Sequence, residues 1–169
     1  MTRRSERDWL GDVRIVDMTP ELAAEMTTWR YPKPYQTYDF VDADPAYFTD
    51  PANGFHALVD DAGTLLGFRS FGPDGRVPGG AYDDSALDTG GGLRPDLTGL
   101  GQGLGRQAIA TGLEYGRETF RPAAFRVTVA AFNTRARHVV ESLGFAHATT
   151  FNATTNGAAY DILVLRCTY

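Results

Sequence analysis

The chain has 169 residues, with 16 Lys and Arg against 21 Asp and Glu, and its net charge is −5. This length suits one domain over residues 1–169 with a substantial core. The hydrophobic share of 43% and the charged share of 22% argue against disorder. The acidity argues against a nucleic-acid-binding protein, because phosphate binding requires clustered basic residues.

Cysteine, histidine and hydropathy patterns point to a cytoplasmic protein without a metal. The single Cys167 cannot form an internal disulfide or a multi-thiolate metal site, and the three histidines lack metal-ligand spacing. The charged first residues carry no apolar stretch behind them, so we expect no signal peptide. Residues 142–160 contain no charged side chain but are too polar to span a membrane.

The first part of the chain predicts a strand, a helix and a hairpin. Residues 13–16 alternate as a strand does. Thr19 and Pro20 provide an N-cap and a first helical residue, and the helix must end before Pro32. Residues 55–59 and 65–71 are predicted as two strands joined by a tight turn.

An aromatic, proline-containing loop is predicted over residues 29–40. It could be a surface loop that covers the core, or a wall of a substrate pocket, because aromatic side chains build concave apolar sites. The second alternative makes four residues candidates for substrate binding: Trp29, Tyr31, Tyr35 and Tyr38.

The second part of the chain predicts alternating strands and helices. A strand over 86–94 leads through a glycine-rich loop to a helix over 103–118. The further elements are a strand at 125–131, a helix from the N-cap Asn133 to Gly144, and strands at 147–151 and 159–165. The fold class is therefore α/β (α+β), with a mixed sheet flanked by helices.

Glycine is concentrated around this loop. Of 19 glycines, 15 lie between Gly63 and Gly116 and seven between Gly90 and Gly105. A glycine loop before a helix favours phosphate binding, because the helix N-terminus exposes unpaired N–H groups. A Walker loop is excluded because Arg106 and Gln107 follow Gly105. A dinucleotide fingerprint ending at Ala108 is a weaker match, since no acidic residue follows about 20 positions on.

The ordered set of motifs from strand to helix resembles the GNAT superfamily of acyl-CoA-dependent N-acetyltransferases, near its ribosomal-protein and small-molecule branches. Residues 93–106 resemble its strand 4, pyrophosphate loop and helix 3. Residues 126–133 resemble strand 5, and Asn133 to Ala136 followed by Leu143-Gly-Phe145 resemble the next helix. The resemblance implies a mostly antiparallel sheet of about six or seven strands that is splayed between strands 4 and 5.

The resemblance also implies acetyl transfer from acetyl-CoA to a primary amine of a small molecule or a protein, by direct attack and without a covalent enzyme intermediate. We expect no nucleic-acid or membrane partner, and we leave a homodimer open. Phosphate and pantetheine binding then fall to the loop, to strand 4 and to the next helix. The residues expected to bind acetyl-CoA are Gly92, Leu93, Arg94, Gly101, Gln102, Gly103, Leu104, Gly105, Arg106 and Asn133.

Two positions depart from the family pattern. The residue that leads the loop is Leu100 if the loop ends at Gly103-x-Gly105, or Thr98 if it ends at Gly101-x-Gly103, where the family has Arg or Gln. Val140 occupies the position of the family's tyrosine acid. A non-catalytic acyl-CoA-binding module is therefore the alternative function, and a dinucleotide-binding enzyme is the third.

Three residues are candidates for proton transfer. Asp88 is the first candidate for the base that deprotonates the amine, since a carboxylate in a cleft can be tuned for that role. Tyr82 and Tyr38 are candidates to replace the missing tyrosine acid. The run Gly90-Gly-Gly92 predicts a bulged strand that is open to a ligand.

Overall fold

Seven strands form a sheet in the order β1-β2-β3-β4-β5-β7-β6 in the computed structural model, which describes residues 12–169. The strand order along the chain matches the prediction, and the number of strands is the upper of the two predicted values. The strands are β1 (Arg14–Asp17), β2 (Phe55–Val59), β3 (Leu65–Phe71), β4 (Leu87–Leu93), β5 (Ala124–Ala130), β6 (Ala146–Asn152) and β7 (Ala159–Arg166).

Four helices connect the strands: α1 (Pro20–Met26), α2 (Pro45–Thr49), α3 (Leu104–Phe120) and α4 (Thr134–Ser142). The predicted caps are present. The Thr19 hydroxyl accepts from the Leu22 N–H at 3.2 Å, and the Asn133 side chain accepts from the Ala136 N–H at 3.2 Å. The sequence did not predict α2, because its five residues are too few to show a helical period.

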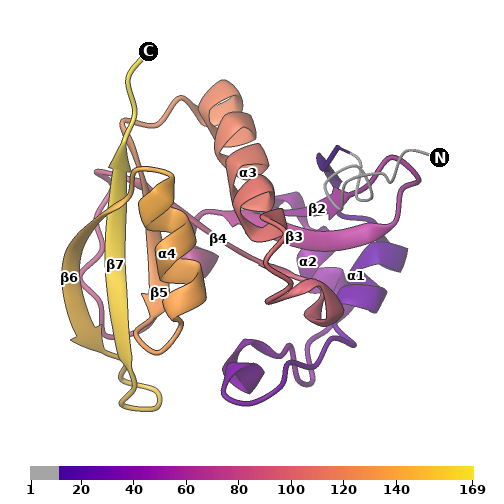
Figure 1. Cartoon of the computed structure of the whole chain (residues 1–169), viewed down its shortest axis with the longest axis horizontal. Helices are drawn as coiled ribbons and strands as arrows, with labels where there is room; N and C mark the ends of the chain where they lie inside the picture. Colours follow the sequence, from indigo (N-terminus) through magenta and orange to yellow (C-terminus); the bar gives the residue numbers. More distant parts are fainter. Residues whose placement is uncertain (1–11) are drawn as a thin grey trace.

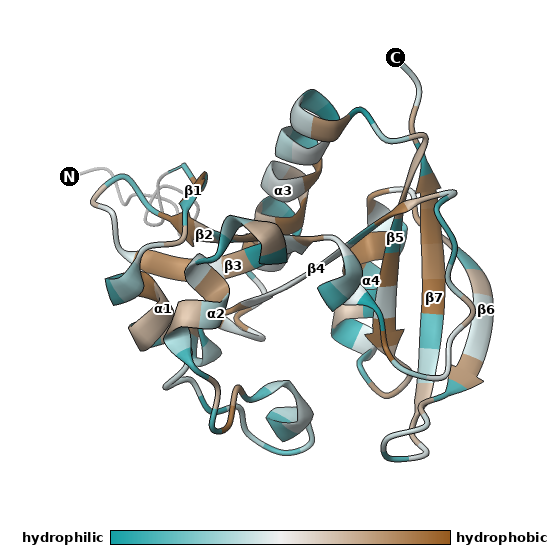
Figure 2. Ribbon diagram, turned by 180° about the vertical axis from the view of Figure 1, so that it is seen from behind, coloured by the Kyte–Doolittle hydropathy of each residue, from teal (hydrophilic) through white to brown (hydrophobic). Residues whose placement is uncertain are grey.

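The helices lie on both faces of the sheet, two on each (Figure 1). Helices α1 and α2 pack through Met26 and Phe48 against β2 and β3. Helices α3 and α4 lie on the opposite face, where Leu113 and Val140 pack against β5 and β7. In Figure 2, β5 and β7 are largely apolar, whereas β4 is pale because glycines occupy its second half.

Two predictions about local structure are wrong. Trp29 is 6% exposed and packs in the core beneath α1, so it does not line a substrate pocket. The glycines of β4 form no bulge: β3 and β4 pair in an unbroken register from Phe71↔Thr89 to Gly67↔Leu93. A regular antiparallel ladder tolerates glycine here because β3 supplies every cross-strand partner.

The parallel pair β4–β5 splits after two residues. Only Leu87↔Phe125 and Asp88↔Arg126 are paired, although both strands continue for several residues. This confirms the predicted splay. We call the region beyond Asp88 and Arg126 the split. The two halves of the sheet diverge there, as Figure 1 shows.

A buried ion pair lies at the start of the split. Asp88 and Arg126 are 3% and 5% exposed, and Arg126 donates from Nε and Nη2 to the two carboxylate oxygens at 2.7 and 2.8 Å. Arg76 adds a third bond, from Nε to Oδ2 at 2.8 Å. The two-pronged geometry compensates for the loss of hydration of both charges.

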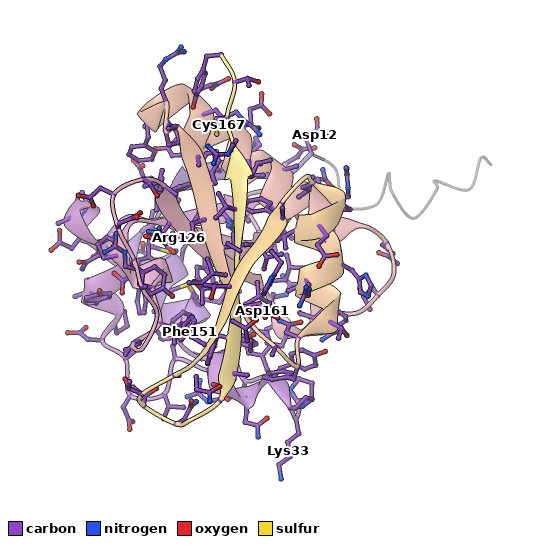
Figure 3. The ribbon with its side chains drawn as sticks, turned by 90° about the vertical axis from the view of Figure 1, so that its left-hand side faces the viewer. Asp12, Lys33, Arg126, Phe151, Asp161 and Cys167 are labelled. Atoms are coloured by element: carbon purple, nitrogen blue, oxygen red, sulfur yellow. The ribbon has the colours of Figure 1, made fainter. Side chains whose placement is uncertain are left out.

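A second ionic contact attaches α4 to the sheet. Asp161 on β7, labelled in Figure 3, is 4% exposed. Its carboxylate accepts from Arg137 of α4 at 2.8 Å and from the Thr150 hydroxyl of β6 at 2.6 Å. This contact holds α4 against the outer half of the sheet, beside the split.

We predict that Asp88→Asn lowers the free energy of unfolding by about 3–5 kcal/mol, because it leaves the buried Arg126 without its counter-charge. Chemical denaturation at pH 7 measures the loss. Asp84→Asn is the matched control, because Asp84 is fully exposed and its contact with Arg76 is long, at 4.0 Å. We expect no measurable change in stability from this variant. Equal stability of the two variants would contradict a structural role for the ion pair.

We predict that His56 makes the protein less stable below about pH 6.5. Burial beside Phe71 and Tyr115 lowers the pKa of His56, while the charge of Asp17 opposes part of that shift. The unfolded chain therefore binds a proton that the folded chain resists, so stability falls as the pH drops below the unfolded pKa and levels off below the folded one.

Urea denaturation at pH 7.5 and 5.5 tests this effect. The stability lost between the two values should be smaller in His56→Gln than in the wild type. It should be unchanged in His138→Gln, where the side chain is exposed. If His56→Gln loses as much stability between pH 7.5 and 5.5 as the wild type does, the pH dependence arises from another group.

Candidate functional site

The register of β4 decides which main-chain groups face the split. The Arg94 N–H donates to Leu66 at 2.7 Å and the Asp88 carbonyl accepts from Gly72 at 2.9 Å, so even-numbered residues of β4 direct their polar groups at β3. Alternation along a strand then turns Gly91 and Leu93 the other way. In the described part of the chain, β5 no longer pairs with them. Gly91 and Leu93 therefore form an open edge of β4.

This geometry corrects part of the predicted acetyl-CoA set. Gly92 and Arg94 have their N–H groups engaged toward β3, so they cannot offer them to a ligand in the split. Leu93 lies on the open edge, and so does Gly91, which the predicted set did not include. Alternation along β4 could have indicated Gly91, because every second residue of the strand faces the split. The sequence alone did not show which alternate set pairs with β3.

The open edge leads directly to the glycine loop. Gly99, Gly101 and Gly103 have φ of +70°, +69° and +74°, a conformation that side chains disfavour. Gly103 is the N-cap of α3 and makes no side-chain cap bond. The first intrahelical bond runs from the Gln107 N–H to the Gly103 carbonyl at 3.0 Å. The N–H groups of residues 104–106 therefore have no acceptor within the helix.

The loop fits a pyrophosphate. A Cβ added at Gly101 or Gly103 would meet no atom within 4 Å, and one at Gly105 would meet only the Leu93 side chain at 3.9 Å. Alternating left-handed residues before a helix N-terminus form a concave set of N–H donors that binds anions. Because the free donors begin after Gly103, the structure favours the register that ends at Gly103-x-Gly105.

Two arginines border the loop. Arg106 lies in the first turn of α3 and reaches across to Ser142 of α4, with 3.3 Å between Nε and Oγ. Arg135 of α4 stacks on the Tyr35 ring at 4.3 Å, and a Cβ at Gly99 would collide with its Nη1. Both charges would attract an anion at the loop. Arg135 is a residue that the sequence interpretation missed, since nothing local placed it beside Gly99.

Two tyrosines from the aromatic loop reach opposite sides of the split. The Tyr31 hydroxyl donates to the Leu93 carbonyl at 2.5 Å, on the open edge of β4. The Tyr38 hydroxyl accepts from Asn133 at 3.1 Å, beyond the end of β5. Burial is the main cause that raises the pKa of both phenols, so both keep their protons near neutral pH. Tyr35 of the same loop lies edge-on to Phe132.

Asn133 therefore has two roles at once. Its side-chain oxygen caps α4, and its nitrogen holds Tyr38. This is compatible with a place beside acetyl-CoA, but both of its polar atoms already have partners.

Tyr82 lies in the loop that precedes β4, and its hydroxyl reaches β5 on the same face of the sheet as Tyr31 and Tyr38. Its hydroxyl is 2.9 Å from the Thr128 hydroxyl and accepts from the Val77 N–H at 3.0 Å. Its ring lies against the Arg126 guanidinium, 5.0 Å from the ring centroid. Thr128 is two residues beyond the last paired residue of β5, so the Tyr82 hydroxyl borders the split.

Asp88 is placed differently from the other predicted site residues. Three guanidinium N–H groups occupy its two oxygens, and it lies at the closed end of the split rather than on the open edge. With its oxygens engaged in this way, the geometry favours a structural role for Asp88. The neighbouring cavity of about 370 Å³, lined by Pro73, Leu87 and Pro122, opens at the end of β4 away from the glycine loop.

Val140 is 3% exposed and packs in the core between α4 and the sheet. No hydroxyl reaches the split from this position of α4. Within residues 12–169, no three His, Cys, Asp or Glu side chains gather as metal ligands do, and no helix is long and apolar enough to cross a membrane.

Comparisons with known proteins agree with this geometry. Three similar solved structures are a GNAT-family acetyltransferase from Bacillus anthracis (13% identity, 93% of this chain and 96% of that one, TM-score 0.72), AAC(6')-Ib in complex with ribostamycin and coenzyme A (16%, 92% and 93%, 0.71), and yncA of Salmonella typhimurium, a putative acetyltransferase with its cofactor acetyl-CoA (15%, 92% and 94%, 0.64). At these identities the likeness establishes the fold. No curated protein matches the chain.

The family comparison covers most of the chain. The model of the acetyltransferase (GNAT) family matches residues 20–145, which include α1, the open edge of β4, the glycine loop and α4. This chain is therefore a member of the GNAT family of acetyltransferases.

Proposed function

We propose that the protein transfers an acetyl group from acetyl-CoA to a primary amine, by direct attack of the amine. One observation carries the proposal: the open edge of β4, at Gly91 and Leu93, leads straight to the uncapped N-terminus of α3. A ligand with a polar chain and a pyrophosphate could bond its chain to the open edge of β4 and its pyrophosphate to the N–H groups at the start of α3.

When bound, acetyl-CoA supplies a thioester whose carbonyl carbon the amine attacks and whose sulfur leaves as a thiolate. The N–H groups of residues 104–106 would hold its pyrophosphate, assisted by Arg106 and Arg135. The N–H groups of Gly91 and Leu93 are the donors available to polarise a carbonyl at the open edge. The Tyr31 hydroxyl fixes this edge, because it bonds the Leu93 carbonyl.

Tyr82 is the best-placed proton donor for the leaving group. Its hydroxyl, carried by the loop before β4, borders the split and is hydrogen-bonded to Thr128 of β5. It replaces, from another element, the tyrosine that α4 lacks at Val140. Binding of acyl-CoA without turnover remains the second candidate function, since Val140 is buried and has no acidic proton to give to the leaving thiolate.

The acceptor belongs on the face that carries the tyrosines, opposite α3 and α4. The net charge of −5, with 15 Asp, suits a protonated amine of a small molecule or a protein. AAC(6')-Ib, solved with ribostamycin, supports a small-molecule acceptor. A cytoplasmic location and a homodimer stay predictions of the sequence.

We expect acetyl-CoA to bind the protein and to release free CoA in the presence of an amine. Isothermal titration measures the first, and a thiol assay over a panel of polyamines, aminoglycosides, amino acids and N-terminal peptides measures the second. Absence of acetyl-CoA binding would disprove the proposal. Binding without CoA release on any amine would favour the non-catalytic module.

We predict that Gly103→Asp weakens CoA binding at least about 30-fold, because it places a negative charge at the anion site, at a cost of about 2 kcal/mol. Gly63→Asp is the matched control. Gly63 also has a positive φ, of +80°, and open space around its Cβ position, but lies in the β2–β3 turn. Unchanged affinity in Gly103→Asp would show that phosphate binds elsewhere.

We predict that Tyr82→Phe lowers kcat at least about 100-fold and leaves the KM for acetyl-CoA within a few-fold, since the variant removes the hydroxyl and keeps the ring against Arg126. Tyr47→Phe is the control: its hydroxyl bonds the exposed Asp74 and lies outside the split. An unchanged kcat in Tyr82→Phe would exclude this hydroxyl as the acid.

A further inference from the structure

Arg69 is a buried arginine whose charge is unpaired within residues 12–169. It lies on β3 and is 5% exposed. Its Nη2 donates to the Thr89 hydroxyl at 3.0 Å. Its Nε is buried without any acceptor, and no described carboxylate forms an ion pair with it. Burying an uncompensated charge is costly, so such groups in native structures call for a specific explanation.

Two glycines make room for this side chain. A Cβ at Gly112 of α3 would lie 2.9 Å from Cγ of Arg69, and one at Gly91 of β4 would lie 2.5 Å from its Nη1. Neither glycine has a positive φ. At Gly112 the atoms that exclude a Cβ are those of Arg69, whereas at Gly91 the main-chain oxygen of Phe68 excludes it as well. The arginine is held in a slot between α3 and β4.

The slot leads to the open edge of β4. Gly91 is exposed, its N–H and C=O face the split, and the Arg69 guanidinium lies against it on the α3 face. Thr89, the partner of Nη2, is the first residue of β4 beyond the last pair with β5. The guanidinium is thus beside the point where the split begins, several residues along β4 from the glycine loop.

Arg69 remains charged at this position. Burial lowers its pKa to about 10, which still leaves the guanidinium protonated at pH 7. The pyrophosphate donors lie beyond Leu93 at the other end of the open edge, so phosphate groups held there do not reach Thr89. The part of a bound acyl-CoA that lies beside Arg69 would therefore be its acyl end.

We infer that Arg69 binds a terminal carboxylate on the acyl group, so that dicarboxylic acyl thioesters, of the succinyl or glutaryl type, bind the same site as acetyl-CoA and bind it more tightly than uncharged acyl chains of similar length. This inference rests on the proposed function, because it assumes that an acyl-CoA occupies the split. A carboxylate would accept from the free donors of the guanidinium and would neutralise it, and two-pronged pairing with arginine gives strong, directional binding.

The test compares two stable thioethers that differ only in charge at the end of the chain: S-(3-carboxypropyl)-CoA and S-butyl-CoA. Isothermal titration against the wild-type protein should show the carboxylate probe bound at least about tenfold more tightly. In Arg69→Met, which conserves volume, the two affinities should become equal while that for CoA is unchanged. Arg69→Lys, which keeps the charge, should retain part of the preference.

Arg14→Met is the control, because Arg14 is an exposed arginine on β1 of the same half of the sheet; its preference should equal that of the wild type. Equal affinities in the wild type, or a preference that persists in Arg69→Met, would overturn the inference and leave the proposed function standing. Failure of CoA and both thioethers to bind would instead remove the proposed function. The wild-type comparison decides the matter even if Arg69→Met does not fold.

Discussion

The ion pair between Asp88 and Arg126 determines where the sheet opens. These two residues form the last pair of β4 with β5, and their buried charges require each other. Beyond them the strands diverge, so the polar main-chain groups of Gly91 and Leu93 have no strand to bond. The open edge begins at this junction, and the glycine loop lies at its far end.

The split separates two chemical environments. On the α3 and α4 face lie the free N–H groups of residues 104–106 and the slot that holds Arg69. On the other face lie the hydroxyls of Tyr31, Tyr38 and Tyr82. Such a division suits a direct transfer, in which the acyl donor and the amine approach the same edge of β4 from opposite sides.

Local sequence signals predicted most elements correctly. Thr19, Asn133 and Gly144 mark helix ends through hydrogen bonds that involve only neighbouring residues, so their positions followed from the sequence. The roles of Trp29 and Asp88 could not be read from local sequence, for a different reason. An aromatic residue can line a pocket or fill a core, and a carboxylate can act as a base or pair with an arginine, and only distant partners decide.

The sequence by itself determined the order of the elements, the glycine loop before α3 and, by resemblance, the family. These depend on spacing within short segments. Only the tertiary structure decided that Gly91 rather than Gly92 faces the split, that Asp88 is held by Arg126, and that Arg69 lies beside the open edge. Each of these depends on strand register or on a contact across the sheet, which residues far apart in the chain create together.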